Sequence, residues 1–346
     1  MPLRRVLCAQ ETGYNVDRKG AVPYIRSRFA SEDELVRELI FWLSKKPAVT
    51  QAIARRGMKS GFARRFVPGE TLAEALGVAE EICQTGRKIS LNQLGESVKT
   101  PEEAHAARDS YITMLRELSA RHIDGNISIK LTQLGLEQSR EMCESLTMEI
   151  ARTAKELGLT VEMDMEGSAL TDVTIEIFES VCGRFDNAGM AIQAYLFRTE
   201  KDLERLARFR PKLRLVKGAY REPAKIAYQG KKDVDASYHR LIDRLLAGDF
   251  SPIFATHDPM MVAHVQDAVR RLGFPVNRYE FEMLYGIRRD LQEQIHAAGQ
   301  PLRVYIPFGS QWCPYFMRRL SERPANCLFV LRSLIAESSR QESPHN

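Results

Sequence analysis

Short runs of β-branched and other apolar residues recur along the chain, separated by amphipathic stretches long enough for helices. Each run has the length and composition of a buried strand. The eight predicted strands are Lys88–Leu91, Ile127–Leu131, Thr160–Asp164, Met190–Gln193, Leu213–Lys217, Ile253–Thr256, Tyr279–Met283 and Arg303–Ile306. Helical periodicity fills most gaps, as at Glu102–Leu118, Arg140–Leu157 and Pro259–Leu272. Eight strand–helix units in about 240 residues predict an α/β fold, the (β/α)8 barrel.

A doubly wound parallel sheet is the competing α/β architecture. Such a sheet normally carries a glycine-rich phosphate turn after an early strand. The chain contains neither G-x-G-x-x-G nor G-x-x-x-x-G-K-[ST], so the pattern favours the barrel.

The segment before the first strand predicts a helical arm. Ser31 opens a pattern typical of a capping box, with leucines at helical spacing after it. A further helix is expected to begin after Gly69, to be capped by Thr71 and to run to about Gln84. The expected organisation is a loose extension at 1–30, a helical arm at 31–84, the barrel at 85–337 and a flexible tail at 338–346.

Composition changes this picture little. Hydrophobic residues make up 44% of the chain, and 50 basic against 45 acidic residues give a net charge of +5, which does not call for a nucleic-acid partner. No apolar run is long enough to span a bilayer. The six cysteines form no C-x-x-C pair, a pattern typical of reduced thiols in a cytosolic protein.

Polar residues gather where the predicted strands end. In a barrel these positions meet at one face, which carries the catalytic groups of barrel enzymes. They are Lys130, Asp164, Gln193, Arg214, Lys217, Thr256, His257, Glu282 and Tyr305. Lys130 and Asp164, on neighbouring strands, are expected to neutralise each other.

The last strand leads into a predicted helix with two adjacent arginines, Arg318 and Arg319, and Glu322 one turn later. Paired guanidiniums suit bidentate capture of a carboxylate or phosphate. In isolation this pattern is typical of a solvated helix end. Its place after a barrel strand favours an anion site.

Several readings of these residues remain open. Lys130 or Lys217 could serve as a Schiff-base lysine, as in barrel aldolases. The basic stretch from Lys45 to Arg65 could dock on a membrane or on nucleic acid. His257 and His264, seven residues apart with no H-E-x-x-H pattern, do not predict a metal site.

The strand ends together resemble those of one family, proline dehydrogenase, in its short monofunctional bacterial form. The resemblance covers about Glu34 to Glu337. The matching motifs are Ser128–Leu131, Asp164–Glu166, Gln193–Tyr195, Leu213–Tyr220, Phe254–His257, Glu280–Gly286 and the segment Leu302–Pro324.

The resemblance implies site residues of two kinds. Residues expected at the substrate, L-proline, are Lys130, Tyr220, Leu284, Tyr305, Arg318, Arg319 and Glu322, with the two arginines on its carboxylate. Residues expected at FAD are Met165, Gln193, Arg214, Lys217, Gly218, Ala219, Thr256 and His257. Asp164 and Arg214 are expected to take part in catalysis, with Arg214 at the N5 edge of the flavin and Asp164 or solvent accepting the amine proton.

The resemblance also implies the reaction and its setting. Hydride transfer from proline C5 to flavin N5 would give 1-pyrroline-5-carboxylate, the first step of proline degradation to glutamate. The electrons would pass to a membrane quinone. We expect a cytoplasmic enzyme with peripheral contact to the inner face of the membrane, and no nucleic-acid partner.

Overall fold

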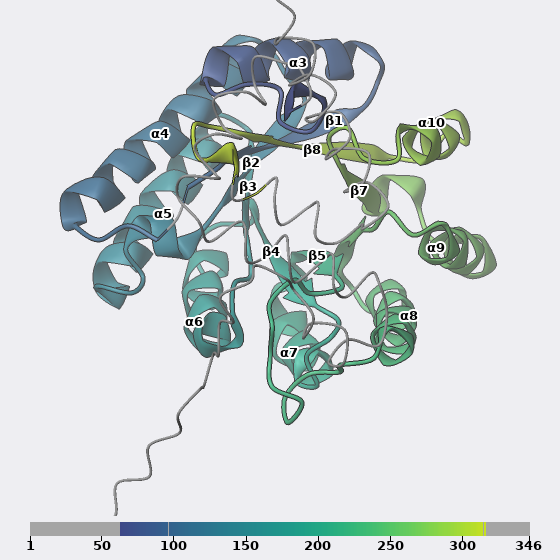
Figure 1. The fold of residues 1–346 in the computed structure, drawn as a ribbon. Coiled ribbons are helices and arrows are strands. Elements are labelled where there is room, and N and C mark those ends of the chain that lie inside the picture. Colours follow the sequence, from purple (N-terminus) through teal and green to yellow (C-terminus); the bar gives the residue numbers. More distant parts are fainter. Residues whose placement is uncertain (1–62, 96, 314, 316–346) are drawn as a thin grey trace, which may run out of the picture. The chain divides into compact units, whose positions relative to one another are not determined.

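The computed structural model describes residues 63–95, 97–313 and 315 of the 346-residue chain. Eight parallel strands pair in sequence order, and β8 pairs with β1 to close the barrel (Figure 1). The strands are β1 (Lys88–Gln93), β2 (Gly125–Ile129), β3 (Thr160–Met163), β4 (Ala188–Gln193), β5 (Lys212–Val216), β6 (Ser251–Ala255), β7 (Glu280–Leu284) and β8 (Leu302–Phe308). The predicted (β/α)8 barrel is confirmed, with strand ends shifted by up to two residues.

Helices surround the barrel on its outside (Figure 1). They are α3 (Leu72–Gln84), α4 (Pro101–Ala120), α5 (Arg140–Glu156), α6 (Thr171–Cys182), α7 (Thr199–Leu206), α8 (Lys231–Ala247), α9 (Pro259–Leu272) and α10 (Arg289–Ala297). Short 3-10 helices lie at Ala63–Arg65, Leu131–Leu134, Ser168–Leu170, Ala207–Phe209 and Val276–Arg278. From α4 to α10, each α-helix follows one strand and precedes the next, as the alternation predicts.

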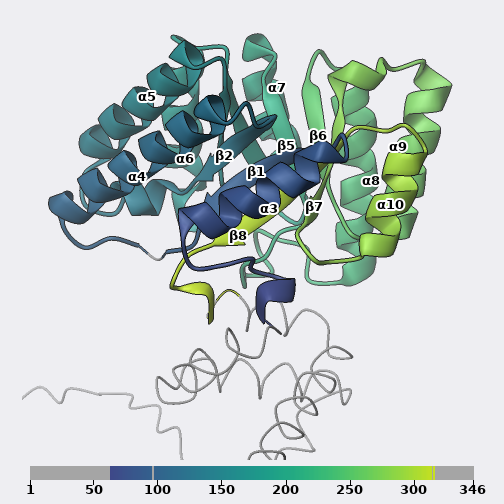
Figure 2. The ribbon, with the colours of Figure 1, turned by 90° about the horizontal axis from the view of Figure 1, so that it is seen from above.

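The helix before the first strand, α3, lies against the barrel wall. Thr71 caps it as expected: its hydroxyl accepts the Glu74 N–H, and Glu74 returns a bond to the Thr71 N–H at 3.1 Å. This helix packs on β1 and β8 (Figure 2). It therefore covers the wall at the point where the barrel closes.

The two faces of the strands differ sharply in polarity. Side chains that face the helices are apolar and fully buried, such as Ile89, Leu91, Ile127 and Phe281. The alternate side chains face into the barrel, because successive residues of a strand point to opposite faces. These inward residues are unusually polar for a barrel, whose interior is normally filled by branched apolar side chains: Ser90, Asn92, Asn126, Ser128, Glu162, Arg214, Glu280, Glu282 and Arg303 are all buried.

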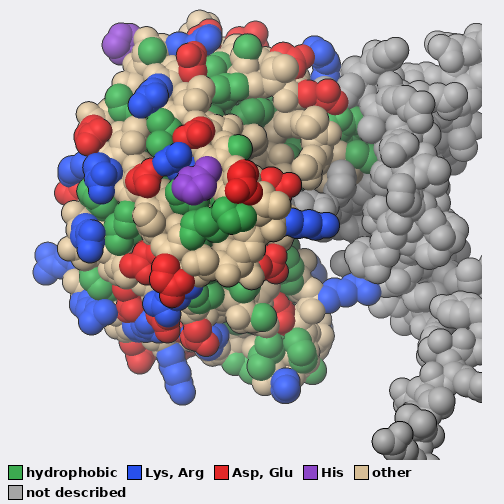
Figure 3. Space-filling view, turned by 90° about the vertical axis from the view of Figure 1, so that its left-hand side faces the viewer, with side chains coloured by type: hydrophobic (Ala, Val, Ile, Leu, Met, Phe, Trp, Pro, Cys, Tyr) green, Lys and Arg blue, Asp and Glu red, His purple; other side chains and the backbone are tan. Residues whose placement is uncertain are grey.

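Acidic and basic side chains are mixed over the face formed by α4, α5 and α6 (Figure 3). Ion pairs connect them, for example Arg140 to Glu176 at 2.6 Å between α5 and α6. A shallow groove on this side is lined mainly by α5 residues, including Glu141, Glu144 and Arg152. It lies outside the barrel, away from the strand ends.

Several predictions fall outside the described residues. They are the extension 1–30, the helix beginning near Ser31, most of the basic stretch Lys45–Arg65, the tail 338–346, and Arg318, Arg319 and Glu322. Within the described ranges, no helix combines the length and apolar character needed to cross a bilayer. Four cysteines there are free thiols, and burial raises the pKa of Cys143 to about 12.

Candidate active site

Asp164 is the centre of a buried cluster at the carboxyl ends of the strands. It follows β3 directly, and both of its carboxylate oxygens accept hydrogen bonds. Oδ1 accepts from Arg214 Nη2 at 2.6 Å and from Ser128 Oγ at 2.7 Å. Oδ2 accepts from Lys130 Nζ at 2.7 Å and from Tyr305 Oη at 3.2 Å. The expected Lys130–Asp164 pair is confirmed, and three further donors converge on the same carboxylate.

Arg214 crosses the barrel interior from β5 and faces three carboxylates. Besides Asp164, its Nη1 donates to Glu282 Oε2 at 3.3 Å, and its Nε lies 3.4 Å from Glu162 Oε2. Only 4% of the Arg214 side chain is exposed. Burial alone would lower the pKa of Arg214, but the three carboxylates hold it well above its ordinary value. The guanidinium therefore keeps its charge in a water-poor environment.

Tyr305 lies on β8 with its ring beside the same guanidinium. The Arg214 Cζ is 5.3 Å from the ring centroid, a distance that permits a cation–π contact. Burial, reinforced by the Asp164 charge, raises the pKa of Tyr305 well above its ordinary value, so the phenol stays a donor. Its hydroxyl points to Asp164, which leaves the ring to form part of the wall.

Opposing effects act on the Asp164 carboxyl. Burial would raise its pKa, but Lys130 and Arg214 outweigh burial and hold the pKa well below its usual range. An acid this strong is a poor proton acceptor near neutral pH. The carboxylate therefore stays ionised and fixes the positions of Lys130 and Arg214 through its hydrogen bonds.

Gln193 carries a buried acceptor with no protein partner. Its Nε2 donates to the carbonyl oxygens of Met165 at 3.0 Å and Glu166 at 3.1 Å. This fixes the amide so that Oε1 faces the other way, and that oxygen is buried without a hydrogen bond from any described residue. A buried acceptor of this kind needs a donor. The N–H of a flavin ring supplies one, so Gln193 fits the cofactor expected here.

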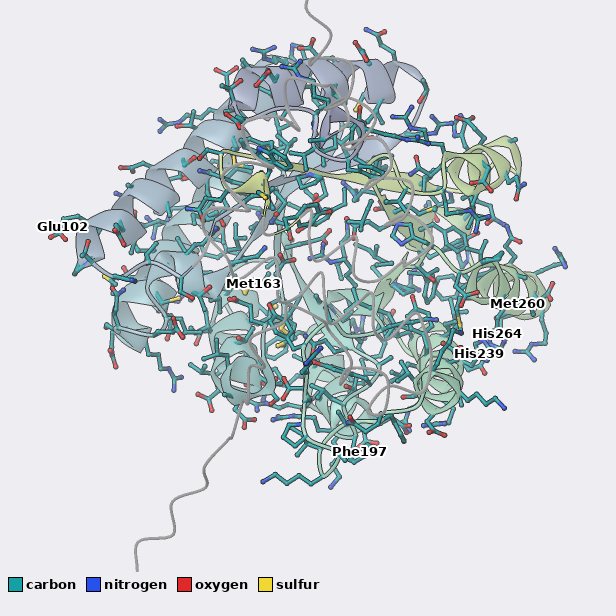
Figure 4. The ribbon with its side chains drawn as sticks, in the orientation of Figure 1. Glu102, Met163, Phe197, His239, Met260 and His264 are labelled. Carbon is teal, nitrogen blue, oxygen red and sulfur yellow. The ribbon has the colours of Figure 1, made fainter. Side chains whose placement is uncertain are left out.

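Lys217 belongs to a separate cluster on the side of α8 and α9. Its Nζ lies 2.6 Å from Asp235 Oδ1 and 3.0 Å from Asp258 Oδ2. Further along the same helices, His239 and His264 stack with their ring centroids 4.3 Å apart (Figure 4). The structure thus does not bring Lys217 to Asp164, although both were predicted at strand ends.

The remaining predicted residues lie in the loops after β5 and β6 and at the end of β7. His257 Nε2 accepts the Leu284 N–H at 2.9 Å, and this bond links the loop after β6 to the end of β7. The Thr256 hydroxyl accepts the Asp258 N–H at 3.1 Å. Ala219 is exposed, and Tyr220 is 37% exposed on the rim.

Gly218 is required for steric reasons. Its φ is +114°, and a Cβ there would lie 2.3 Å from the Tyr195 ring. A side chain at this position would need both a strained backbone and a displaced tyrosine. The close approach of the Gly218 backbone to its neighbours is therefore built into the loop.

Ser128 and Glu162 were not predicted as site residues, and Glu282 was noted only as a strand end. The structure places all three around Arg214. A signal for them exists: polar residues repeat every second position in strands that should be apolar, as in Glu162 and Asp164 or Glu280 and Glu282. In a buried strand, that period marks the inward face.

The fold and this cluster define a class: a (β/α)8-barrel enzyme with a charged interior that opens at the carboxyl ends of its strands. The family model for proline dehydrogenase matches residues 75–332. The chain belongs to the proline dehydrogenase family.

Curated relatives agree with this assignment over their whole length. The chain is 37% identical to proline dehydrogenase from Deinococcus radiodurans, over 88% of this chain and 99% of that protein. It is 33% identical to proline dehydrogenase 1 from Bacillus subtilis, over 87% of this chain and 99% of that protein.

Among solved structures, the barrel resembles part of proline utilization A from Bdellovibrio bacteriovorus, inactivated by N-propargylglycine. The TM-score is 0.73 at 25% identity, over 84% of this chain. The match spans only 35% of that longer protein. In sequence, this chain is also similar to part of the bifunctional proline utilization A of Escherichia coli. The two are 31% identical over 80% of this chain and 24% of that protein.

Proposed function

We propose that this chain oxidises L-proline to 1-pyrroline-5-carboxylate with FAD as its cofactor, the first step of proline degradation. The observation that carries the proposal is the Asp164 cluster. Lys130 directly follows β2, Arg214 lies on β5 and Tyr305 lies on β8, and each donates to that one carboxylate. These are residues that the family resemblance assigns to proline and to the flavin edge.

On the substrate side, Lys130 is proposed to supply a positive charge and Tyr305 an aromatic face. Lys130 is an ammonium fixed by Asp164 and suits the proline carboxylate. The Tyr305 ring suits the flat face of a pyrrolidine, with little room for a ring hydroxyl. Arg318 and Arg319, supported by Glu322, are proposed from the family resemblance to complete the carboxylate site, with Tyr220 and Leu284 at its edge.

On the cofactor side, Gln193 and Arg214 have matching chemistry. Gln193 Oε1 is a buried acceptor suited to a ring N–H, and the Arg214 guanidinium suits the edge that becomes electron-rich on reduction. When bound, FAD would supply the hydride acceptor that no amino acid side chain provides. The protein's part is to hold proline C5 within about 3–3.5 Å of that acceptor. Met165, Lys217, Gly218, Ala219, Thr256 and His257 are proposed around the rest of the cofactor.

The electrons are proposed to pass to a membrane quinone. The enzyme would then act in the cytoplasm and touch the inner face of the membrane peripherally. A barrel aldolase is the rival reading. Against it, Lys130 and Lys217 are both ion-paired to carboxylates rather than open to a carbonyl substrate.

The visible absorption spectrum of the purified protein tests the proposal. We expect flavin bands that bleach when L-proline is added without oxygen, and that do not bleach with D-proline. Colourless protein that borohydride joins covalently to an aldehyde would overturn the proposal in favour of the aldolase.

Arg318→Lys gives a matched variant for the carboxylate site. A lysine keeps the charge but loses the bidentate geometry, so the KM for proline should rise at least tenfold while flavin content stays the same. An unchanged KM in both Arg318→Lys and Arg319→Lys would remove these residues from the proposed site.

A further inference from the structure

Glu282 lies deeper in the barrel than Asp164 and has no role in the reaction as described. It comes from β7, and only 2% of its side chain is exposed. Its Oε2 accepts from Arg214 Nη1 at 3.3 Å, a long bond for a charged pair. Its Oε1 is buried and receives no hydrogen bond from the residues that the structure describes. A fully ionised carboxylate would be poorly compensated in this position.

The charges around Glu282 do not balance. Arg214 and Lys130 carry two positive charges, and they face three carboxylates: Glu162, Asp164 and Glu282. Beside Glu282 on β8 lies Arg303, but its guanidinium is bound through two nitrogens to Glu280, at 2.7 and 3.1 Å. The other neighbouring strand, β6, has the sequence Ser-Pro-Ile-Phe-Ala and contributes no titratable side chain. Glu280 has a second cation, Lys88, at 3.0 Å, and the described ion pairs of Lys88 do not include Glu162 or Glu282. Within the group of Arg214, Lys130, Glu162, Asp164 and Glu282, the negative charges thus exceed the positive ones by one, and a single proton would balance them.

Glu282 is the carboxylate best placed to hold that proton. Asp164 accepts four hydrogen bonds, two of them from cations. Glu162 and Glu282 each have one buried oxygen without a hydrogen bond from the described residues, but Glu162 Oε1 accepts a bond from Asn126, whereas Glu282 has only the 3.3 Å bond from Arg214. Burial, opposed in part by Arg214 and reinforced by Glu162, raises the pKa of Glu282 to about 7. Glu282 therefore changes its charge within the physiological range.

We propose that Glu282 is a positioning residue that carries an exchangeable proton beneath Arg214 and so sets how much of the Arg214 charge acts at the carboxyl end of the barrel. The proton passes between the Glu282 carboxyl and bulk water, and no other bond changes. When Glu282 is neutral, Asp164 is the close counter-ion of Arg214, and the guanidinium attracts anionic groups above it. When Glu282 ionises, its negative charge offsets that attraction. This inference rests on the proposed function for the identity of the anionic groups, a substrate carboxylate and a reduced flavin.

The protonation itself is tested without any substrate. Infrared difference spectra of the purified protein between pH 5.5 and pH 8.5 should show a buried carboxylic acid band that disappears as pH rises. The band should be absent in Glu282→Gln and retained in Glu280→Gln, which changes the other buried carboxylate of the same strand. Glu282→Asp keeps an ionisable group on a shorter arm, so it should shift the midpoint of the band. This second variant keeps the test decisive if Glu282→Gln does not fold.

The effect on Arg214 is tested with an anionic ligand that cannot be oxidised. Cyclopentanecarboxylate has the ring of proline with carbon in place of nitrogen, and its binding can be followed by calorimetry. Its Kd for the wild-type protein should rise about tenfold between pH 6 and pH 8.5, the scale expected for a unit charge about 10 Å away. In Glu282→Gln the Kd should stay nearly constant, whereas Glu280→Gln should follow the wild type.

Two results would overturn the proposal: a carboxylic acid band that persists in Glu282→Gln, or a Kd that rises equally with pH in wild type and Glu282→Gln. Failure of the proposed function is a different result. Protein without flavin absorption or proline oxidation would refute the dehydrogenase, while the infrared band would still decide the state of Glu282.

Discussion

Two buried arginines in the same barrel, Arg303 and Arg214, are held in opposite ways. Arg303 binds Glu280 through two nitrogens, at 2.7 and 3.1 Å, and donates a third bond to the Ile89 carbonyl at 2.7 Å. Arg214 shares its charge among three carboxylates at 2.6, 3.3 and 3.4 Å, and its Nε makes no hydrogen bond within the described part of the chain. Each guanidinium nitrogen of Arg303 has a hydrogen-bond acceptor, whereas Arg214 keeps one nitrogen, Nε, without an acceptor among the described residues.

Glu280 and Glu282, the carboxylates beside these two arginines, differ in pKa in the same sense. Burial would raise the pKa of Glu280, but Arg303 outweighs burial and lowers it to about 2. For Glu282, two residues along the same strand, burial wins over Arg214 and raises the pKa to about 7. A closed pair holds the fold together, whereas an unbalanced cluster can respond to a ligand. The positions of the two arginines fit these different roles, because only Arg214 contacts Asp164 at the carboxyl end of the barrel.

Breaking the satisfied pair should have the largest effect on stability. Arg303→Met leaves Glu280 with Lys88 as its remaining cation, at 3.0 Å. We expect the free energy of unfolding in urea to fall by about 3 kcal/mol, the lower end of the usual cost of breaking a buried ion pair, because Lys88 still offsets part of the Glu280 charge. The control is Arg278→Met, which removes an exposed pair with Asp249 and should cost less than about 1 kcal/mol. Equal losses in the two variants would contradict the assignment of Arg303 as the structural arginine.

The two carboxylates of β7 should give opposite pH dependences of stability. Glu280 has a folded pKa below the ordinary 4.5, so its contribution is present above pH 4.5 and is lost as pH falls toward 2. Glu282 has a folded pKa above 4.5, so its contribution is present below pH 4.5 and is lost as pH rises to about 7. Each shift corresponds to about 3 kcal/mol. Urea titrations from about pH 2 to pH 8 should show Glu282→Gln gaining on the wild type as pH rises from 4.5 to about 7, and Glu280→Gln losing to it as pH rises from about 2 to 4.5. If the stabilities of the wild type and both variants change with pH in parallel, the predicted difference between Glu280 and Glu282 is wrong.

Shortening the functional arginine should affect catalysis more than folding. Arg214→Lys keeps the charge but cannot reach Asp164, Glu162 and Glu282 together. We expect kcat/KM for proline to fall about a hundredfold, the lower range for loss of a preorganised donor. The measurement is steady-state kinetics with an artificial electron acceptor. The matched control, Arg303→Lys, should lower kcat/KM by less than about threefold in protein that is still folded.

The substitution Tyr305→Phe should have the smallest effect of these variants on catalysis. Tyr305→Phe keeps the ring and removes only the 3.2 Å bond to Asp164, so the KM for proline should change by about threefold or less. Tyr305→Ser removes the ring and should relax discrimination against hydroxyproline. An unaltered preference in the serine variant would exclude Tyr305 as the ring filter.

The fold was largely predictable from the sequence, because strand and helix periods are local properties. The alternating leucines of β5, Leu213 and Leu215, and the spacing of Leu115 and Leu118 in α4 each show in a window of about a dozen residues. The cap of α3 was equally visible, since Thr71 and Glu74 are three residues apart.

The candidate site was less predictable, because its contacts are not local. Asp164 and Tyr305 are 141 residues apart, and Arg214 and Glu282 are 68 apart. Only its two-residue spacing from Asp164 marks Glu162 as an inward residue, and that spacing does not say which side chains it meets. The strand-end pattern supplied Lys130, Arg214 and Tyr305, and the family resemblance supplied their expected roles. The charge balance around Arg214 required coordinates.

The place of α3 has a consequence for how this protein is made. Because α3 packs on β1 and β8, the outer wall at the seam is covered by chain that precedes the first strand. A nascent chain that has emerged from the ribosome as far as Phe308 already holds every strand of the barrel and the helices α3 to α10. Arg318 and Arg319 follow Phe308 in the chain and emerge after it. The barrel strands can thus all leave the ribosome before the arginines proposed to recognise the substrate.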